Sequence, residues 1–380
     1  MGGALDGARV LELVDEPAVE YCGRILAGLG ADVVKLEPAQ GSPSRRVGPF
    51  VGDEEGPDRS LSFWHHNVGK RSAVVDDARA AELCRVADVL VHTMRDVDAA
   101  GRGLGWERLS ELNPALVVCA VTPFGQDGPW AEYQADDLVL MALGGTMITN
   151  GYPPREGVYD TPPLTCYGDQ AWHTAATYAA IAVLAALWAG EGQFVDVSAH
   201  QASASMTEWH LVNFMFTGEP SPRGGMASLG VTAADGRQVV CLNPDFLGPH
   251  VFTNLLAMLE ADDVAGPLSD PAFEDPVHRA RNYGEIGRAT RRLAALHDGE
   301  ELWRMGQAAG LPWGVVRAPE ETLDDRHLRA RGHFVDVEHP EMGCTVTYSG
   351  APFLAHRSPW AFRRRPPLLG EHTDEVLRGE

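Results

Sequence analysis

The chain has 380 residues, of which 44% are hydrophobic and 22% charged; this supplies apolar material for one large or two moderate cores and argues against disorder. Its net charge of -22 argues against a nucleic-acid partner or an anionic membrane surface, because either would require a positively charged face. The six scattered cysteines form no Cys-x-x-Cys pair and no signal-peptide pattern opens the chain, so we expect buried thiols in a cytoplasmic protein without a zinc site.

The first forty residues predict a strand, a helix and a second strand. The strands are expected over Ala8–Val14 and Ala31–Leu36, with the helix over Pro17–Leu29 between them. Pro17 suits the first turn of that helix and Gly30 suits its end. Because the connecting loops are short, we expect parallel strands joined by a right-handed crossover, which is a Rossmann-like beginning.

Further strands continue this pattern. They are expected at Ala73–Val75, Val89–His92, Leu116–Val121 and Phe194–Val197, with a helix at Ala78–Val86. Alternating strands and helices predict an α/β fold in which helices cover both faces of a parallel sheet.

Dinucleotide binding is considered because Glu37 stands where a ribose-binding acid follows the first strand-helix-strand unit. The glycine fingerprint is missing, since the first strand runs into Asp15-Glu16-Pro17. These residues add two negative charges where a pyrophosphate would lie. We therefore expect no NAD or flavin. The chain also lacks Walker, zincin and Gly-x-Ser-x-Gly patterns, so neither metal nor serine-hydrolase chemistry is expected.

A second, smaller α+β domain is expected after a loop-like stretch at 218–225. Asp235-Gly236 predicts a hairpin turn before a strand at Gln238–Leu242. Amphipathic helices follow, expected at Phe252–Leu259, Tyr283–Leu296 and Glu300–Ala309. The predicted division is therefore a large domain over 1–210, a small domain over 211–322, and a return to the large domain over 323–380.

Gly168 and Asp169 precede an alanine-rich helix over Ala171–Ala189. That segment is long enough to cross a membrane, but its alanine content and polar side chains favour a helix buried in a core. A carboxylate at a helix N-terminus meets the positive end of the helix dipole, which keeps it ionised and nucleophilic. Aspartate at this position also commonly caps its own helix, so Asp169 is either a nucleophile or a cap.

Motifs in the front, middle and end of the chain occur together in one known family. They are Leu26–Pro38, Asn67–Ser72, Leu104–Leu109, Asn113–Val118, Phe124–Pro129, Gly310–Val316 and Pro366–Thr373. With the Gly168-Asp169 pair, they resemble the family III coenzyme A transferases (CaiB/BaiF), which include the formyl-CoA and carnitine CoA-transferases. The resemblance implies an interlocked homodimer that moves CoA from an acyl-CoA donor to a small carboxylic acid acceptor, with CoA as a substrate.

The resemblance also implies roles for individual residues. Asp169 would carry the acyl group. From the residues themselves, we expect Gly168, Gln170 and His173 to position it and the backbone N–H groups near Gly168 to Ala171 to stabilise the oxyanion. The expected CoA contacts are Lys35, Arg45, Arg46, Lys70, Arg71, Arg102, Phe124 and Gly125. Lys35 and Lys70 are the only two lysines of the sequence, and both lie in the family-like motifs. Coding bias toward arginine is the alternative explanation for so few lysines.

Two departures from the family pattern lie near Asp169. Trp172-His173 replaces small residues, and the glycine loop that covers the aspartate is reduced to Arg223-Gly224-Gly225. His173 follows Asp169 by one helical turn, so its imidazole either contacts that carboxylate or points into the core. Candidate walls of the acyl pocket, with core packing as the alternative, are Trp172, Met206, Trp209 and Phe214.

Two other functions stay open. The resemblance extends to 2-methylacyl-CoA racemases, but their histidine position reads Asp136, a weaker base beside a second carboxylate at Asp137. The same pair also suits a solvated loop or a helix cap. The other alternative is a CoA-binding paralogue without turnover, because Trp172, His173 and the short glycine loop depart from the pattern.

Overall fold

The computed structural model describes residues 2–151, 160–220, 223, 228–242 and 249–379. The chain divides into two compact units: Met1–Gly224 with His327–Glu380, and Gly225–Arg326. The second unit begins after helix α10 (Glu208–Thr217), which belongs to the first unit, and not at residue 211 where the sequence places the boundary. It ends at residue 326 instead of 322.

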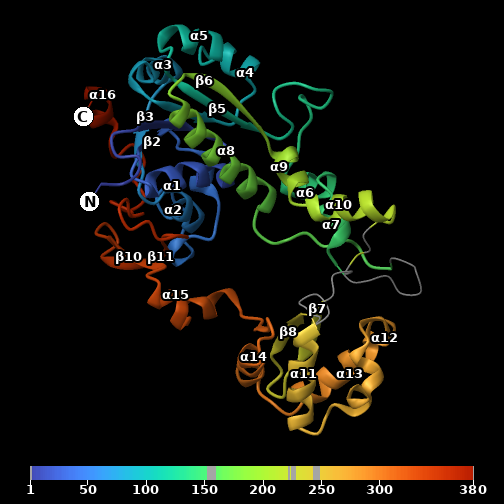
Figure 1. The fold of residues 1–380 in the computed structure, drawn as a ribbon. Coiled ribbons are helices and arrows are strands. Elements are labelled where there is room, and N and C mark those ends of the chain that lie inside the picture. The colour runs from blue at the N-terminus through green and yellow to red at the C-terminus, as the bar shows by residue number, and fades with distance from the viewer. Residues whose placement is uncertain (1, 152–159, 221–222, 224–227, 243–248, 380) are drawn as a thin grey trace. The chain divides into compact units, whose positions relative to one another are not determined.

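A six-stranded parallel sheet forms the centre of the first unit (Figure 1). Its strands are β1 (Arg9–Leu13), β2 (Asp32–Glu37), β3 (Arg71–Val74), β4 (Val89–His92), β5 (Val117–Thr122) and β6 (Gln193–Ser198). The strand order is β3-β2-β1-β4-β5-β6, with every neighbouring pair parallel. This is the order of a Rossmann fold, so the expected Rossmann-like parallel sheet is confirmed.

Neighbouring residues of a strand point to opposite faces of the sheet, and helices cover both faces. Val10 and Val117 pack on one face with α1 (Glu20–Gly28) and α8 (Gln170–Ala189). Leu11 packs on the other face, where α3 (Asp77–Leu83), α4 (Asp96–Gly101) and α5 (Trp106–Leu112) lie (Figure 1). The central strands β4 and β5 accordingly read as nearly continuous apolar runs.

Shorter helices complete the first unit. They are α2 (Leu61–Asn67), α6 (Asp137–Leu143), α7 (Thr146–Thr149), α9 (Ala199–Ser205), α15 (Arg326–Ala330) and α16 (Thr373–Arg378). Short 3₁₀ helices are η1 (Pro17–Val19), η2 (Pro43–Arg46), η3 (Val51–Asp53) and η4 (Cys84–Val86). An antiparallel pair, β10 (Phe334–His339) and β11 (Cys344–Ser349), precedes the C-terminal segment.

The C-terminal segment packs against the first unit. The indole of Trp360 lies on Gly28, where an added Cβ would come within 2.1 Å of the ring. The backbone N–H of His372 donates to the carbonyl of Ser72 at 2.9 Å, and that of Val74 donates to Thr373 Oγ1 at 3.0 Å. These contacts hold the end of the chain along β3.

Helix α8 is long and apolar enough to cross a membrane by length and composition alone, the one such helix in the described part of the chain. One of its faces is buried in the core, where Ala175, Ala179 and Val183 pack with α1 and the sheet. The opposite face leaves Tyr178 and Trp188 exposed. The expected buried helix is thus confirmed for one face only.

The second unit contains a three-stranded antiparallel sheet, β7 (Ser228–Thr232), β8 (Gln238–Leu242) and β9 (Gly314–Val315). The predicted hairpin joins β7 to β8 around Gly236, whose φ of 84° needs glycine. The helices are α11 (Pro249–Ala261), η6 (Gly266–Ser269), η7 (Pro271–Glu274), α12 (Pro276–Arg281), α13 (Tyr283–Ala294), α14 (Gly299–Ala308) and η8 (Pro319–Asp324). The unit has its own core.

Candidate active site

Asp169 lies directly before α8 in a left-handed turn. Its φ and ψ are 42° and 46°, and Gly168 before it has a φ of 84°. A residue with a Cβ loses about 1–2 kcal/mol in this conformation, so neighbouring contacts must hold the turn. The Asp169 side chain is exposed and makes no capping hydrogen bond to the helix.

Asp137, the first residue of α6, caps α8 instead. Its Oδ1 accepts hydrogen bonds from the backbone N–H groups of Ala171 at 2.8 Å and Trp172 at 3.3 Å. These are the second and third residues of α8, whose N–H groups the residue before a helix ordinarily binds. Asp169 is therefore not the cap of its helix. The Ala171 N–H, expected to face an oxyanion, is already paired with Asp137.

Glu16 brings a third carboxyl group to this region, from the start of η1 at the carboxyl end of β1. Burial raises the pKa of Glu16 to about 7; the Ala18 N–H opposes this shift, and the carboxylates of Asp169, Glu20 and Asp137 add to it. The pKa of Asp137 is also raised, chiefly by burial and further by Asp169. Sequence reasoning missed both roles. The available signal was acidic residues at the sheet edge where α/β folds bind ligands.

The carbonyl of Gly168 is held by two side chains. Gln170 Nε2 donates to it at 3.0 Å, and His173 Nδ1 lies 3.3 Å from it. Gln170 Nε2 also donates to the Tyr167 carbonyl at 3.0 Å. His173 thus contacts the backbone before Asp169, which is neither of the two arrangements expected for it. Its other ring nitrogen, Nε2, lies 3.0 Å from Nε2 of His66, on α2.

Asp136 caps its own helix, since its Oδ1 accepts a hydrogen bond from the Val139 N–H at 3.0 Å. This agrees with the helix-cap interpretation of the Asp136-Asp137 pair. The carboxylate that a racemase would need as its base is engaged in capping α6.

The two lysines expected to bind CoA phosphates lie inside the core. Lys35 Nζ is 2.6 Å from Glu20 Oε1, and Lys70 Nζ is 2.8 Å from both carboxylate oxygens of Glu12. All four side chains have 0% exposure. Burial lowers the pKa of Lys70, whereas for Lys35 the Glu20 and Glu12 carboxylates outweigh burial and raise the pKa. Lys35 and Lys70 are therefore structural residues and not phosphate ligands.

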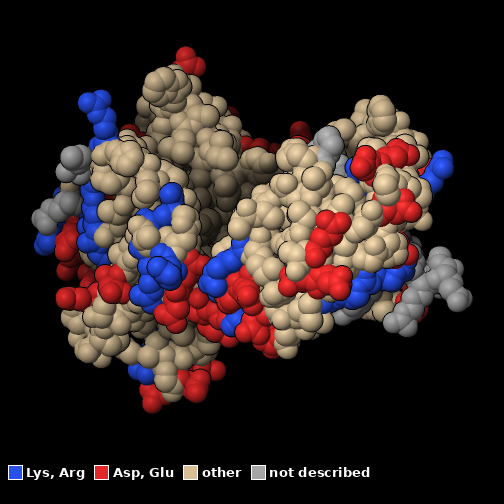
Figure 2. Space-filling model, turned by 60° about the horizontal axis from the view of Figure 1, so that its bottom comes forward, with Lys and Arg blue, Asp and Glu red and all other residues tan. Residues whose placement is uncertain are grey.

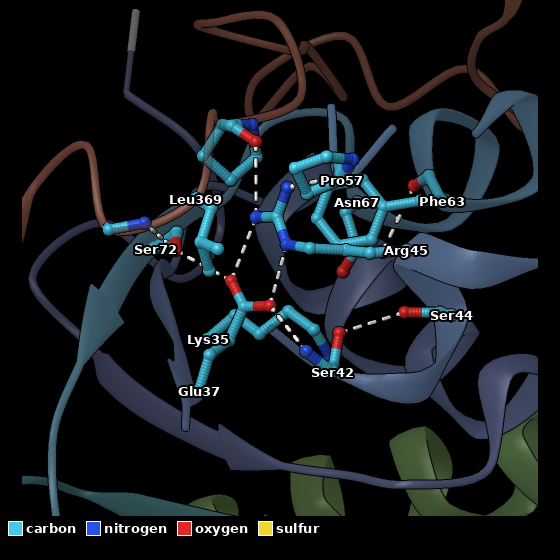
Figure 3. Close-up of polar contacts among 12 residues, drawn as sticks. Lys35, Glu37, Ser42, Ser44, Arg45, Pro57, Phe63, Asn67, Ser72 and Leu369 are labelled. Atoms are coloured by element: carbon cyan, nitrogen blue, oxygen red, sulfur yellow. Dashed lines mark hydrogen bonds and ion pairs between the residues drawn. The ribbon is translucent and has the colours of Figure 1, made fainter. Parts of the chain in front are cut away.

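Arg45 is likewise an internal residue (Figure 3). Its Nε and Nη2 donate to the two oxygens of Glu37 at 2.7 and 2.8 Å, and its Nη1 donates to Asp58 at 2.8 Å. Ser72 Oγ and the Ser42 N–H also donate to Glu37. Burial alone would raise the pKa of Glu37, but Arg45, with smaller contributions from Lys35 and Ser72, lowers it to about 2. The expected phosphate contact of Arg45 is thus replaced by a buried ion pair.

The other three arginines differ in position. Arg71 begins β3 and pairs with Asp32 at the start of β2, which is the edge of the sheet opposite to that of Glu16. Arg46 is exposed beside Arg45, and Arg102 forms a surface pair with Asp77 at 2.6 Å. Figure 2 shows basic side chains interspersed with acidic ones on the face it draws. Of the expected cations, Arg46 and Arg102 are accessible after the carboxyl ends of strands.

Phe124 and Gly125 follow β5 and line a pocket of about 370 Å³. Three rings meet there. The ring centroids of Phe124 and Trp130 are 5.9 Å apart, and that of His200 lies 5.6 Å from each of them. The lining includes Asp196 and no lysine or arginine among its described residues. This pocket suits an uncharged or planar part of a ligand better than a phosphate.

The family model described as CoA-transferase family III matches residues 5–373. The chain belongs to this family. It is 32% identical to succinyl-CoA:(R)-benzylsuccinate CoA-transferase subunit BbsE of Thauera aromatica, over 99% of this chain and 94% of that protein. It is 29% identical to succinate--glutarate CoA-transferase of Agrobacterium fabrum, over 98% and 94%. A CAIB/BAIF family protein from Brucella suis has the same fold, with a TM-score of 0.83 and 25% identity over 100% of both chains. The predicted family and its CoA-transferase function are confirmed.

Other expectations for this family III chain need correction or lie outside the described residues. Cys166 and Cys344 are exposed, whereas the other four thiols are buried as expected. Of the candidate pocket walls, Trp172 is buried in the core, whereas Met206, Trp209 and Phe214 are exposed. Gly224 and Gly225 of the shortened loop lie outside the described residues. Among the described residues, no group of three His, Cys, Asp or Glu side chains is arranged to hold a metal ion.

Proposed function

We propose that the chain transfers CoA from an acyl-CoA donor to a carboxylic acid through a covalent acyl intermediate on Asp169. The observation that carries this proposal is the capping of α8 by Asp137. It leaves the Asp169 carboxylate exposed at the positive end of the helix dipole, with no helix N–H to bind. An ionised carboxylate in that position needs no base to act as a nucleophile.

The reaction follows from this arrangement without net proton or redox change. A carboxylate oxygen of Asp169 attacks the thioester carbonyl, the C–S bond breaks, and the CoA thiolate leaves a mixed anhydride. The thiolate then attacks the Asp169 carbonyl, which releases the donor acid as a carboxylate and gives an aspartyl-CoA thioester. The acceptor carboxylate attacks this thioester, the C–S bond breaks, and the CoA thiolate leaves a second anhydride. The thiolate attacks the acceptor carbonyl, which completes the new acyl-CoA and restores Asp169.

For the substrates, we propose succinyl-CoA as donor and a dicarboxylic acid as acceptor. Relatives with related names support this choice, including the succinyl-CoA:(R)-benzylsuccinate enzyme and a succinyl-CoA--D-citramalate CoA-transferase of Chloroflexus aurantiacus. We assign the CoA phosphates to Arg46 and Arg102, the accessible members of the expected set. Their separate replacement by alanine should raise the KM for the acyl-CoA and leave kcat nearly unchanged.

A homodimer is part of the proposal. Helix α10 has no buried residue, and Trp209, Met215 and Phe216 are 67%, 77% and 91% exposed. An apolar face of this kind on a single chain marks an interface, and we assign it to a second copy of the chain. Light scattering after size exclusion should give twice the chain mass. A monomeric mass for fully active enzyme would contradict the assignment.

We also propose a cytoplasmic location. All six cysteines are unpaired, which supports a reducing compartment. Fractionation of cells that express the full chain should recover it with soluble reduced proteins.

The experiment for the catalytic role compares the natural chain with Asp169→Ala. Incubation with succinyl-CoA and hydroxylamine should trap the intermediate as a hydroxamate at residue 169, located by mass spectrometry of the peptides. The Asp169→Ala variant should lose CoA exchange and still bind CoA. Exchange retained by this variant would refute the nucleophile. CoA binding without any trapped adduct in the natural chain would instead indicate a paralogue without turnover.

A further inference from the structure

The turn that presents Asp169 depends on one peptide group. The plane between Gly168 and Asp169 carries the Gly168 carbonyl, so fixing that carbonyl fixes both ψ of Gly168 and φ of Asp169. A φ of 42° is unfavourable for aspartate. Rotation of this peptide would take φ of Asp169 to a negative value, as in an ordinary capping residue, and would redirect its side chain toward the helix N–H groups that Asp137 binds.

One of two paired imidazoles contacts that carbonyl. His173 places Nδ1 at 3.3 Å from the Gly168 oxygen and Nε2 at 3.0 Å from His66 Nε2. The ring of Tyr21 packs edge-on against His173, with centroids 5.3 Å apart. His66 is 6% exposed, so its ring is fixed in the core beside α8. The pair therefore links buried helix α2 to the backbone just before Asp169.

The placement of protons in this pair is determined by its ends. A carbonyl oxygen only accepts, so His173 Nδ1 must carry its hydrogen. In the neutral ring Nε2 is then an acceptor, and His66 Nε2 must donate to it. The remaining nitrogen of neutral His66, Nδ1, then carries no hydrogen. Burial lowers the pKa of His66 to about 3, which keeps the ring in this neutral form.

We propose that His173, oriented by His66, is a positioning residue that holds the Gly168 carbonyl and thereby keeps Asp169 in its left-handed, uncapped conformation. The proposal rests on the function proposed for Asp169 and adds two residues to it. Neither imidazole touches the acyl group or exchanges a proton with it. Their effect is on the orientation of the nucleophile, so it belongs to kcat and not to acyl-CoA binding.

Asparagine and glutamine separate the two contacts of His173. The amide of asparagine places an N–H near the position of Nδ1, whereas that of glutamine reaches the position of Nε2. We expect His173→Ala to lower kcat about tenfold, as for one lost hydrogen bond, with the KM for succinyl-CoA unchanged. His173→Asn should recover most of the loss, and His173→Gln should remain as slow as His173→Ala. His66→Ala should be slow and His66→Gln faster, while His65→Asn, on the same helix, serves as the matched control.

Each variant is assayed for kcat, KM, yield of hydroxamate at Asp169, and thermal unfolding. Full rates in all histidine variants, or equal loss in His173→Ala and His173→Asn when both remain folded, would overturn the positioning role. Recovery by His173→Gln but not by His173→Asn would overturn it in favour of a role through His66 alone. Asp169→Ala is assayed in parallel. Loss of exchange in this variant with no effect of the histidines rejects only the positioning role, whereas retained exchange rejects both proposals.

Discussion

Replacing Arg45 with alanine removes the guanidinium that neutralises Glu37 in the core of the first unit (Figure 3). Glu37 has 0% side-chain exposure and would keep only the Ser42 and Ser72 donors. Breaking a buried pair by removing one partner costs about 3–5 kcal/mol. The pKa of Glu37 has the same direction, because Arg45, together with Lys35 and Ser72, lowers it from 4.5 to about 2 against the effect of burial.

The effect depends on pH in a defined direction. The folded-state pKa of Glu37 is depressed, so its stabilisation is fully present above pH 4.5 and is lost as the pH falls toward 2. In Arg45→Ala the unpaired carboxyl group takes up a proton more easily, which relieves the penalty in acid. The difference in unfolding free energy between the two proteins should therefore be largest near pH 7 and shrink as the pH falls through the pKa of the unpaired carboxyl group toward 2.

Urea unfolding followed by circular dichroism at pH 7 and pH 4 measures this difference. Arg46→Ala is the matched control, because Arg46 is the exposed neighbour of Arg45 and its removal leaves no buried acid unpaired. It should leave stability within about 0.5 kcal/mol of the natural chain. An Arg45→Ala protein of natural stability with a raised KM for acyl-CoA would refute the reasoning and restore Arg45 as a phosphate ligand.

Three further outcomes follow from other contacts. Asp137→Ala should destabilise the fold by about 1–2 kcal/mol, because the α8 N–H groups lose their cap. It should also lower kcat, because these N–H groups are then free to bind Asp169. Asp137→Asn keeps an acceptor and should lose less stability in thermal unfolding. Burial lowers the pKa of His66 from 6.5 to about 3, so as the pH falls the unfolded chain takes up a proton at this residue before the folded chain does. The contribution of His66 to the free energy of unfolding should therefore fall by about 2–3 kcal/mol between pH 6.5 and 4.5. A His66→Gln chain with the same acid sensitivity would contradict this. Gly28→Val should cost about 1–3 kcal/mol by collision with Trp360, whereas Gly101→Ala, where a Cβ meets nothing within 4 Å, should not lower the melting temperature.

The sheet was predictable because its strands are buried on both faces. Val89–His92 was expected with the bounds that β4 has, and all six residues of β5 are buried. An apolar run of this length between turn signals can only be a strand of a covered sheet or a buried helix, and β-branched residues decide in favour of the strand. The helix ends and the domain boundary at residue 211 were less certain because they depend on packing.

The burial of Lys35 and Lys70 in ion pairs was not predictable from the residue types alone. A lone lysine in a Rossmann-like strand suits a phosphate site. Lys35 instead pairs with Glu20 on the preceding crossover helix, and Lys70 pairs with Glu12 on β1. These partners come together only when the sheet closes. One signal was available, since Lys35 lies between two apolar residues in a strand whose both faces are covered, so its side chain must be buried and paired.

The division of roles between two carboxylates links packing to chemistry. Asp137 reaches the α8 N–H groups because Leu140 and Met141 of its helix pack in the same core as Ala171 and Trp172. The cap therefore comes from tertiary packing and not from the residue that the sequence places before the helix. The positive end of α8 still acts on Asp169, whose oxygens need not bind any helix N–H. An aspartate that capped its own helix would accept hydrogen bonds from the backbone. Because Asp137 at the start of α6 accepts them instead, the Asp169 carboxylate is left available for the nucleophilic role that we propose for it.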